Sequence, residues 1–599
     1  MLKRILNFKT LANYLVGLGM VLLCVYTLYP IRNILGNNVV VVSGVIAFCG
    51  GYNFSNSFQW LVNEKRIKFN LIVLVTLSLY YSVSIIAVKE LQKSLYNIFT
   101  LSLVKNVVLT CIWVFPAVLV LFKIFACRSL GLTRWTDKSK KKTLVCIGIL
   151  LSLEFILLIV ALNPTITVMM SYSSLFNARH LGEEVIYDWV SPFYFILLRL
   201  IINIVDSVTF IALIQYLLFI LVYLKGIAYL IEKGIGAKWI AAITAYIMLN
   251  ISLQMMLLTV MPDSLYLSFM LWLTILMAKI VDTKGEILNK YIFLLEVVFA
   301  ATFVALLRQN GMLIAVACTI AITLLHFKRN KKCVIVPLLL LLIIACVKGP
   351  IYKSIRVEEQ PHFKFLALTN DMLNSYYSGQ ELDKDTLRLV NNVTCYKPED
   401  YSYTQFKALY NTDGYNMEAL KDYSTGEFLK IYIVNFIRNP KSVMTAVLCR
   451  TQQIWSVAHP RGAFTVIIQP FNYRGDTEEE ILLSGIPERK NNIGTRIVER
   501  VFDWTTNVES VTYKVFWRGN FLYNVLLFAF GVFILNFNGE KKEKWYCLLC
   551  LLPIILSVFT LLVGGGWPDY RYHVPAIVIV PFLSLYLMRN KSGLIGRDL

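Results

Sequence analysis

The sequence predicts an all-α polytopic membrane protein with about 14 transmembrane helices, within a range of roughly 12–15, and a mostly helical extracytoplasmic domain. The 599-residue chain is 57% hydrophobic and only 16% charged, and its mean hydropathy is +0.62. Many apolar runs have the length of about 17–22 residues that spans the hydrocarbon core of a bilayer. Basic residues gather in short segments between these runs. A soluble protein of this size could not bury so much apolar surface in one core.

The apolar runs divide the chain into four regions. Residues 1–142 form an N-terminal membrane region of about four helices, and residues 143–350 form a membrane core with an outer loop at 163–190. Residues 351–520 form the extracytoplasmic domain, and residues 521–599 supply the C-terminal membrane helices. We expect spans at 14–31, 38–54, 69–88, 106–126, 143–162, 207–225, 239–257, 263–280, 291–307, 311–327, 334–350, 521–537, 545–563 and 573–588.

The net charge of +21 would suggest a nucleic-acid partner in a soluble protein. Here the basic clusters instead indicate membrane topology, because cytoplasmic loops are enriched in Lys and Arg. They predict a multi-pass protein of the cell membrane with both termini in the cytoplasm, residues 351–520 outside, and no nucleic-acid partner. The twelve Cys show no spacing typical of a metal site and are expected to act as small apolar residues.

One segment, 191–205, does not fit this count, because a span here would invert every later loop. Arg199 and Asp206 interrupt the apolar region. Two interpretations remain open at this stage. The segment is a helix that lies in or dips into the outer face of the membrane, or it is the start of one long tilted helix that runs to about residue 225.

Polar clusters from distant parts of the sequence are predicted to meet at the outer face. The triplet Arg308, Gln309 and Asn310 lies between two apolar runs, and Asp263 begins another. The remaining members come from the loop 163–190 and from the last span, and they are Arg179, His180, Glu183, Glu184, Asp188, Asp569, Arg571, Tyr572 and His573. Acids and bases gathered there would suit a polar, anionic substrate at the bilayer surface.

Several of these motifs resemble those of a known superfamily. They are "MPDSLY" (261–266), "LRQNGM" (307–312), "PHFKFLALTNDMLNSYYSGQELDKDTLRLV" (361–390), "NFIRNPKSVMTAVLCRTQQIW" (435–455) and "YRYHVPAIVIVPFL" (570–583). Together they resemble polytopic bacterial membrane proteins of the GT-C glycosyltransferase superfamily, and most closely a largely uncharacterised Gram-positive family of that type. The resemblance covers most of residues 163–590 and leaves the first 140 or so residues unexplained.

The resemblance implies an integral-membrane glycosyltransferase that takes a sugar from a polyprenyl-phosphate donor and modifies an envelope glycan acceptor on the outer face. It also implies an acidic residue in the first outer loop that acts as a base or metal ligand. This chain departs from that pattern, because Tyr172 stands where an Asp is expected and Ser191-Pro192 stands where His-Pro is expected. Either a remaining acid serves, or the chain has lost catalysis.

Glycosyl transfer to a hydroxyl requires a carboxylate to accept the proton and a cation to hold the departing phosphate. Glu183 and Glu184 are the candidate bases, followed by Asp188; the plainer alternative is an exposed acidic loop. Asp263 could bind a sugar hydroxyl or a divalent cation such as Mg²⁺ or Mn²⁺, or could simply favour a helix N-terminus. No cofactor is certain from the sequence.

Arg308 and Arg571 are the candidate phosphate ligands, since an Arg fork matches phosphate oxygens; the alternative is that they reach lipid headgroups. Gln309 and Asn310 could bond sugar hydroxyls or cap backbone groups. Tyr572 could stack on a sugar or belong to the interfacial aromatic belt, and His573 could carry protons or be structural.

Two other functions remain open from the sequence. A lipid-linked glycan transporter or flippase would also need basic residues at a membrane mouth, and Glu154 and Glu296 inside predicted spans need a partner or water. A non-catalytic envelope-assembly protein could keep the same fold without the chemistry.

Overall fold

The computed structural model describes residues 8–31, 37–64, 67–93, 99–127, 133, 135–188, 190–358, 362–393, 416–456, 492–506, 515, 519–536, 546–564 and 570–589. These residues are almost entirely helical, apart from one parallel pair of two-residue strands, β1 (Ile186–Tyr187) and β2 (Val357–Glu358). The all-α polytopic class predicted from the sequence is therefore confirmed.

Every predicted span overlaps an apolar helix. Within the described residues ten helices are long and apolar enough to cross a membrane, and a bent pair gives up to eleven. The helices that match the predicted spans are α2 (Phe8–Leu28), α4 (Asn37–Val62), α5 (Ile67–Lys93), α6 (Leu101–Cys127), α7 (Asp137–Leu162), α10 (Val208–Glu232), α11 (Ala237–Leu249), α12 (Ile251–Leu258), α13 (Pro262–Asp282), α14 (Tyr291–Leu307), α15 (Gln309–His326), α16 (Ile335–Cys346), α27 (Gly519–Asn536), α29 (Leu552–Gly564) and α30 (Val574–Met588). Four apolar helices are shorter, including α14, α27 and α29, so the total of fourteen is not established.

The span predicted at 239–257 is not one continuous helix, because α11 and α12 meet there at a bend of 62°. The bent pair remains a candidate span. Asn250 lies at the break, and its side chain accepts a hydrogen bond from the backbone N–H of Leu253 at 3.1 Å. That bond caps the start of α12, as Asn commonly does at a helix N-terminus. The chain after the bend meets the segment 163–190, the predicted outer loop, where Ile166 and Thr259 form a β-bridge.

Of the two interpretations of 191–205, the one that makes it the start of a single long helix to about residue 225 is wrong. A separate short helix, α9 (Pro192–Ile202), ends before α10 begins. Ser191 caps α9 and Ser207 caps α10, each accepting a hydrogen bond from a backbone N–H three residues on. At 11 residues, α9 is too short to span a bilayer. It packs against α8 (Met169–Arg179), which lies within the predicted outer loop.

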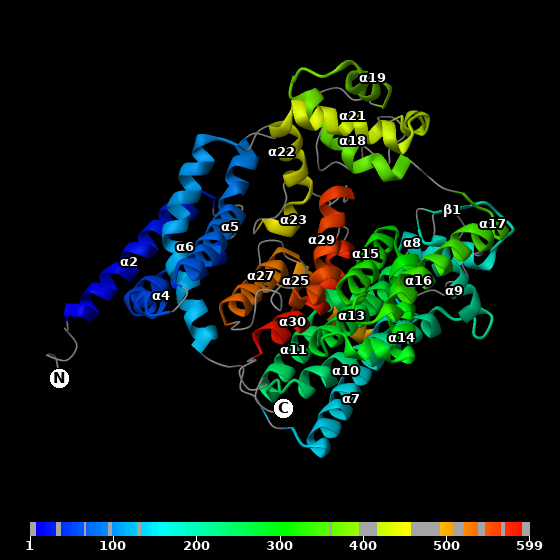
Figure 1. The fold of residues 1–599 in the computed structure, drawn as a ribbon, viewed down its shortest axis with the longest axis horizontal. Helices are drawn as coiled ribbons and strands as arrows, with labels where there is room; N and C mark the ends of the chain where they lie inside the picture. The colour runs from blue at the N-terminus through cyan, green and yellow to red at the C-terminus, as the bar shows by residue number, and fades with distance from the viewer. Residues whose placement is uncertain are drawn as a thin grey trace.

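The N-terminal helices α2, α4, α5 and α6 form a bundle on the left of Figure 1, beside the membrane core. Small residues allow close packing within it. A Cβ on Gly50 would lie 2.7 Å from the backbone N of Ala117, and one on Gly51 would lie 2.9 Å from the Cα of Gly17. Helix α27 joins the two parts, since it packs against α5 and α6 on one side and α30 on the other.

A cap of helices lies above the ends of α15 and α29 in Figure 1. The cap consists of α18 (His362–Tyr377), α19 (Lys384–Val393), α21 (Thr425–Arg438) and α22 (Pro440–Arg450), with α23 (Gln452–Trp455) leading down to α27. Its own core includes Phe365, Leu389 and Phe428. Apart from β2, the regular structure in the described part of the predicted extracytoplasmic domain is thus helical.

Candidate functional site

Arg308 stands at a break between two membrane helices. It is the only residue between α14 and α15, and its extended backbone (φ −143°, ψ 145°) interrupts the helical path. The turn is tight, because a Cβ on Gly311 would lie 1.9 Å from the carbonyl oxygen of Val304. Gly is therefore required for the two helices to approach here, and the turn holds Arg308 at the helix ends nearest the cap.

Three predicted site residues meet at this break. The guanidinium of Arg308 forms an ion pair with Asp263 in the first turn of α13. Its centre lies 5.0 Å from the ring centroid of Tyr572 and 5.6 Å from that of Tyr266, within the range of cation–π interactions. The Asp263 side chain is 6% exposed and the Arg308 side chain 17% exposed. Segments more than 250 residues apart in the sequence therefore build one partly open cationic site, for which Tyr266 is an additional wall residue.

The amide side chains of Gln309 and Asn310, which follow Arg308, form hydrogen bonds with two other segments. Gln309 Nε2 donates a hydrogen bond of 2.8 Å to the backbone carbonyl of Asp188 in the outer loop. Asn310 Nδ2 donates to the hydroxyl of Thr560 on α29 at 3.4 Å. The Oδ1 atom of Asn310 is buried and has no hydrogen-bond partner among the described residues.

Arg571 and His573, from the motif that begins the last span, contact different parts of the molecule. Arg571 contacts the sulfur of Met170 on α8, so the segment that carries Tyr572 lies against the outer loop. His573 is buried, and its Nδ1 lies 3.2 Å from the hydroxyl of Tyr523 on α27. This contact gives His573 a packing role. Asp569 lies outside the described residues.

The candidate bases lie on the same outer loop but are not equivalent. The side chains of Glu183 and Glu184 are exposed, and the carbonyl of Glu183 accepts a hydrogen bond of 3.0 Å from Arg356. Asp188 is partly buried, and its carbonyl bonds Gln309. Of the three, Asp188 is thus the one tied directly to the Arg308 turn.

The other two loop residues predicted for the site, Arg179 and His180, have local partners. Arg179 pairs with Asp206 at 2.7 Å, and its carbonyl accepts a hydrogen bond from Arg199. The His180 ring packs on that of Phe176. The hydrogen bond from Arg199 holds α8 against α9.

Within the described residues, no group of three or more His, Cys, Asp or Glu side chains could hold a metal ion. Asp263 is a single carboxylate already paired with Arg308.

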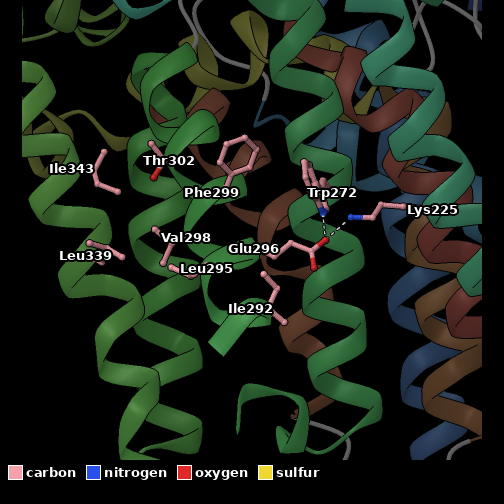
Figure 2. A pocket seen from close by; sticks show the side chains of 10 residues that line it. All are labelled: Lys225, Trp272, Ile292, Leu295, Glu296, Val298, Phe299, Thr302, Leu339 and Ile343. Atoms are coloured by element: carbon pink, nitrogen blue, oxygen red, sulfur yellow. Dashed lines mark hydrogen bonds and ion pairs between the residues drawn. The ribbon is translucent and has the colours of Figure 1, made fainter. Parts of the chain in front are cut away.

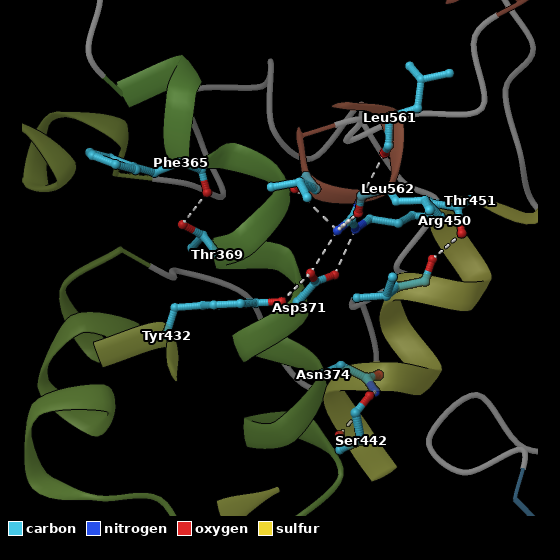
Figure 3. A network of polar contacts seen from close by, with 12 residues as sticks. Phe365, Thr369, Asp371, Asn374, Tyr432, Ser442, Arg450, Thr451, Leu561 and Leu562 are labelled. Atoms are coloured by element: carbon cyan, nitrogen blue, oxygen red, sulfur yellow. Dashed lines mark hydrogen bonds and ion pairs between the residues drawn. The ribbon is translucent and has the colours of Figure 1, made fainter. Parts of the chain in front are cut away.

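A second ion pair, which sequence reasoning missed, joins the cap to the membrane core (Figure 3). Arg450 on α22 donates to Asp371 on α18 through Nε at 2.9 Å and Nη2 at 3.0 Å. Arg450 also donates to the carbonyl of Leu562 in the last turn of α29 at 2.8 Å. The two side chains are 1% and 0% exposed. Asp371 falls on the apolar face of a helix that also buries Leu368 and Met372, and that placement is the only signal the sequence offered.

Burial raises the pKa of Asp371, and the facing Arg450 guanidinium and the hydroxyl of Tyr432 oppose that rise. Arg450 satisfies carbonyls that the end of a helix leaves without partners. The pair therefore fixes the C-terminal end of α29, which precedes the segment that carries Arg571 and Tyr572.

Comparison of the chain with family models, with curated proteins and with solved structures gives no significant match.

Proposed function

We propose that the protein is a GT-C-like integral-membrane glycosyltransferase that uses a polyprenyl-phosphate-linked sugar to modify an envelope glycan on the outer face of a bacterial membrane. The observation that carries the proposal is the meeting of Asp263, Arg308 and Tyr572 beneath the helical cap. A guanidinium at a membrane mouth, flanked by aromatic rings, suits a ligand with a phosphate, a sugar and an apolar tail. The motif resemblance points the same way.

The proposal includes a membrane arrangement of about 14 spans with both termini in the cytoplasm. In that arrangement the short helices α14, α27 and α29 and the bent pair of α11 and α12 also cross the bilayer. Helix α9 remains at the outer face. The cap and the Arg308 turn then share the outer side, where the cap would hold the glycan acceptor.

In the proposed reaction, the bond between the anomeric carbon and the carrier phosphate breaks as a bond to the acceptor hydroxyl oxygen forms. The leaving phosphate keeps the electron pair, and Arg308 and Arg571 stabilise its charge. A carboxylate accepts the hydroxyl proton. Asp188 is the first candidate base, because its backbone is bonded to Gln309, followed by Glu183 and Glu184.

The resting ion pair has a consequence for binding. Phosphate must share Arg308 with Asp263, and a guanidinium has five N–H donors with which to contact both. Asp263 then orients the guanidinium and remains able to accept a hydrogen bond from a sugar hydroxyl.

The proposal is tested by comparing envelope glycans and lipid-linked sugars in host cells that lack the gene and in cells complemented with wild type, Arg308→Lys or Arg329→Lys. Arg329 is the matched control, because it also pairs with a carboxylate, Glu286 at 2.7 Å, but is 56% exposed and lies at the opposite end of α15. Loss of one glycan branch that wild type and Arg329→Lys restore, but Arg308→Lys does not, supports the transferase.

Two other outcomes would overturn it. Lipid-linked sugars that accumulate on the inner leaflet indicate a transporter. Unchanged glycans and unchanged lipid-linked sugars indicate a non-catalytic protein.

Where the transferase is supported, the base is assigned by amide substitution of Asp188, Glu183 and Glu184. Product formation that survives all three substitutions excludes the loop carboxylates.

A further inference from the structure

A groove of about 600 Å³ opens on the membrane-facing side of the core, apart from the outer site. Its walls come from α10, α13, α14 and α16, as Figure 2 shows. Most lining side chains are apolar, and Ile292, Leu295 and Phe299 are 76%, 54% and 48% exposed. Such an exposed apolar surface on a membrane helix faces lipid chains.

An ion pair interrupts this apolar surface. Lys225 Nζ lies 2.5 Å from Glu296 Oε1, and Trp272 Nε1 donates to the same oxygen at 2.8 Å. The Lys225 ammonium also lies 4.2 Å from the centroid of the Trp272 ring. The Lys225 side chain is nonetheless 44% exposed and that of Glu296 26% exposed. Two charges that face hydrocarbon are costly unless a polar group meets them.

The depth of the pair argues against a simple topological role. At 1.5 Å per residue, Lys225 lies ~10 Å inside the end of α10 at Glu232, and Glu296 lies ~7 Å inside the start of α14. A Lys that only marks topology lies in the loop or extends toward it. Lys225 is instead held by Glu296 and Trp272, well inside the ends of both helices.

The local charge favours an anion. Lys279 on α13 acts electrostatically on Glu296 together with Lys225, so a second ammonium group adds positive potential at the carboxylate. A third, Lys332, lies over the Tyr291 ring at the same end of α14, 4.3 Å from its centroid. Above the pair the groove continues between Phe299, Leu339 and Ile343, which provides a path for a hydrocarbon chain.

We propose that this groove binds an anionic phospholipid, with its phosphate at Lys225 and one acyl chain between α14 and α16. The site is independent of the transferase reaction and lies in the leaflet at the α14 N-terminal end. Under the positive-inside expectation, that leaflet is the cytoplasmic one.

The experiment uses the full chain in phosphatidylcholine bilayers that contain brominated phosphatidylglycerol or brominated phosphatidylcholine. Bromine quenches nearby indole fluorescence, and subtraction of a Trp272→Phe sample isolates the signal of Trp272 in the groove. The ratio of the two binding constants measures headgroup preference. We expect a ratio of roughly fivefold in favour of phosphatidylglycerol, the effect of about one Lys near an anionic headgroup.

Three variants are expected to change the ratio in different ways. Lys225→Gln should bring the ratio close to one. Glu296→Gln should raise the ratio above that of wild type, because it removes the competing carboxylate, and misfolding does not produce an increase. Lys141→Gln is the control, because Lys141 lines a separate groove at the start of α7, and it should leave the ratio unchanged.

A wild-type ratio of one would show that only ordinary boundary lipid contacts the groove, and would overturn the proposal. The proposal would also be overturned if Lys225→Gln left the ratio unchanged, or if Lys141→Gln lowered the ratio as much as Lys225→Gln does. A decrease with Glu296→Gln would show that the pair is structural and that Lys225 does not contact the phosphate.

Discussion

Two of the Arg–Asp pairs among the described residues, Arg450–Asp371 and Arg308–Asp263, differ in what surrounds them. The Arg450–Asp371 pair is almost fully buried, and Arg450 also bonds the end of α29. The Arg308–Asp263 pair is 17% and 6% exposed, and lies between two Tyr rings at a helix break. In the first place Arg450 also bonds α29 and so joins two parts of the molecule; in the second the guanidinium lies partly exposed at a helix break. We expect this difference in exposure to separate a structural role for Arg450–Asp371 from a ligand-binding role for Arg308–Asp263.

The largest effect is expected from Arg450→Met, which removes one partner and leaves the Asp371 carboxylate buried without its counter-ion. The free energy of unfolding should fall by ~3–5 kcal/mol, measured by thermal or steric-trap unfolding of the reconstituted protein. The double variant Arg450→Met with Asp371→Leu should recover part of the loss, because no isolated charge remains. A double variant no more stable than the single would show that the contacts of Arg450 to α29, and not the pair, determine stability.

The second prediction concerns Arg308→Lys, which keeps the charge and loses the planar fork. Product formation should fall by ~10²-fold, the usual effect of removing one donor that stabilises a developing negative charge. The melting temperature should change much less than in Arg450→Met. If Arg308→Lys instead melts early and its folded fraction remains active, the two pairs have the same structural role.

The third prediction tests the aromatic wall of the outer site. Tyr572→Leu removes the ring 5.0 Å from the Arg308 guanidinium, and a cation–π contact of this kind is worth about 0.5–2 kcal/mol. We expect KM for the lipid donor to rise roughly two- to thirtyfold with a smaller change in kcat. Tyr572→Phe keeps a ring and serves as the control; an equal loss in both variants would assign the effect to the hydroxyl.

The smallest effect concerns a third carboxylate, Asp383, which caps α19 on the surface of the cap. Partial burial raises its pKa, but hydrogen bonds from the Thr386 side chain and the backbone N–H groups of Thr386 and Asp385 outweigh this and hold the pKa below its usual range. A lowered pKa in the folded state means that the contribution to stability is present above the unfolded pKa, near 3.9. It is lost as the pH falls through the lower folded value.

Hydrogen exchange of the first turn of α19 should therefore increase as the pH is lowered from about 5 to 3, after correction for intrinsic rates. Asp383→Asn should reduce this dependence on pH, because Asn caps a helix without titrating. Equal pH dependence in both proteins would assign the loss to another group.

The helices and their approximate limits could be predicted from the sequence, because an apolar run of spanning length is a local property. The sequence also placed the Arg308 turn between two helices and Asp263 in the first turn of a third. It did not reveal the bend at Asn250, because the apolar pattern continues across residues 239–257 while a side-chain cap ends one helix and begins another. The 14-span total and the side on which the cap lies stay predictions.

The contacts between helices were decided by tertiary structure alone. The charges of Lys225, Glu296, Asp371 and Arg450 can be read in the sequence, but which pairs meet depends on the rotation of each helix about its axis and on its packing angle. Those quantities arise from the whole bundle and not from any single segment. By itself the sequence determined an α-helical membrane protein with polar groups at the ends of its spans. Packing decided that Asp263, Arg308 and Tyr572 share one site, that Arg450 joins the cap to α29, and that Lys225 and Glu296 lie in a groove that faces the lipid.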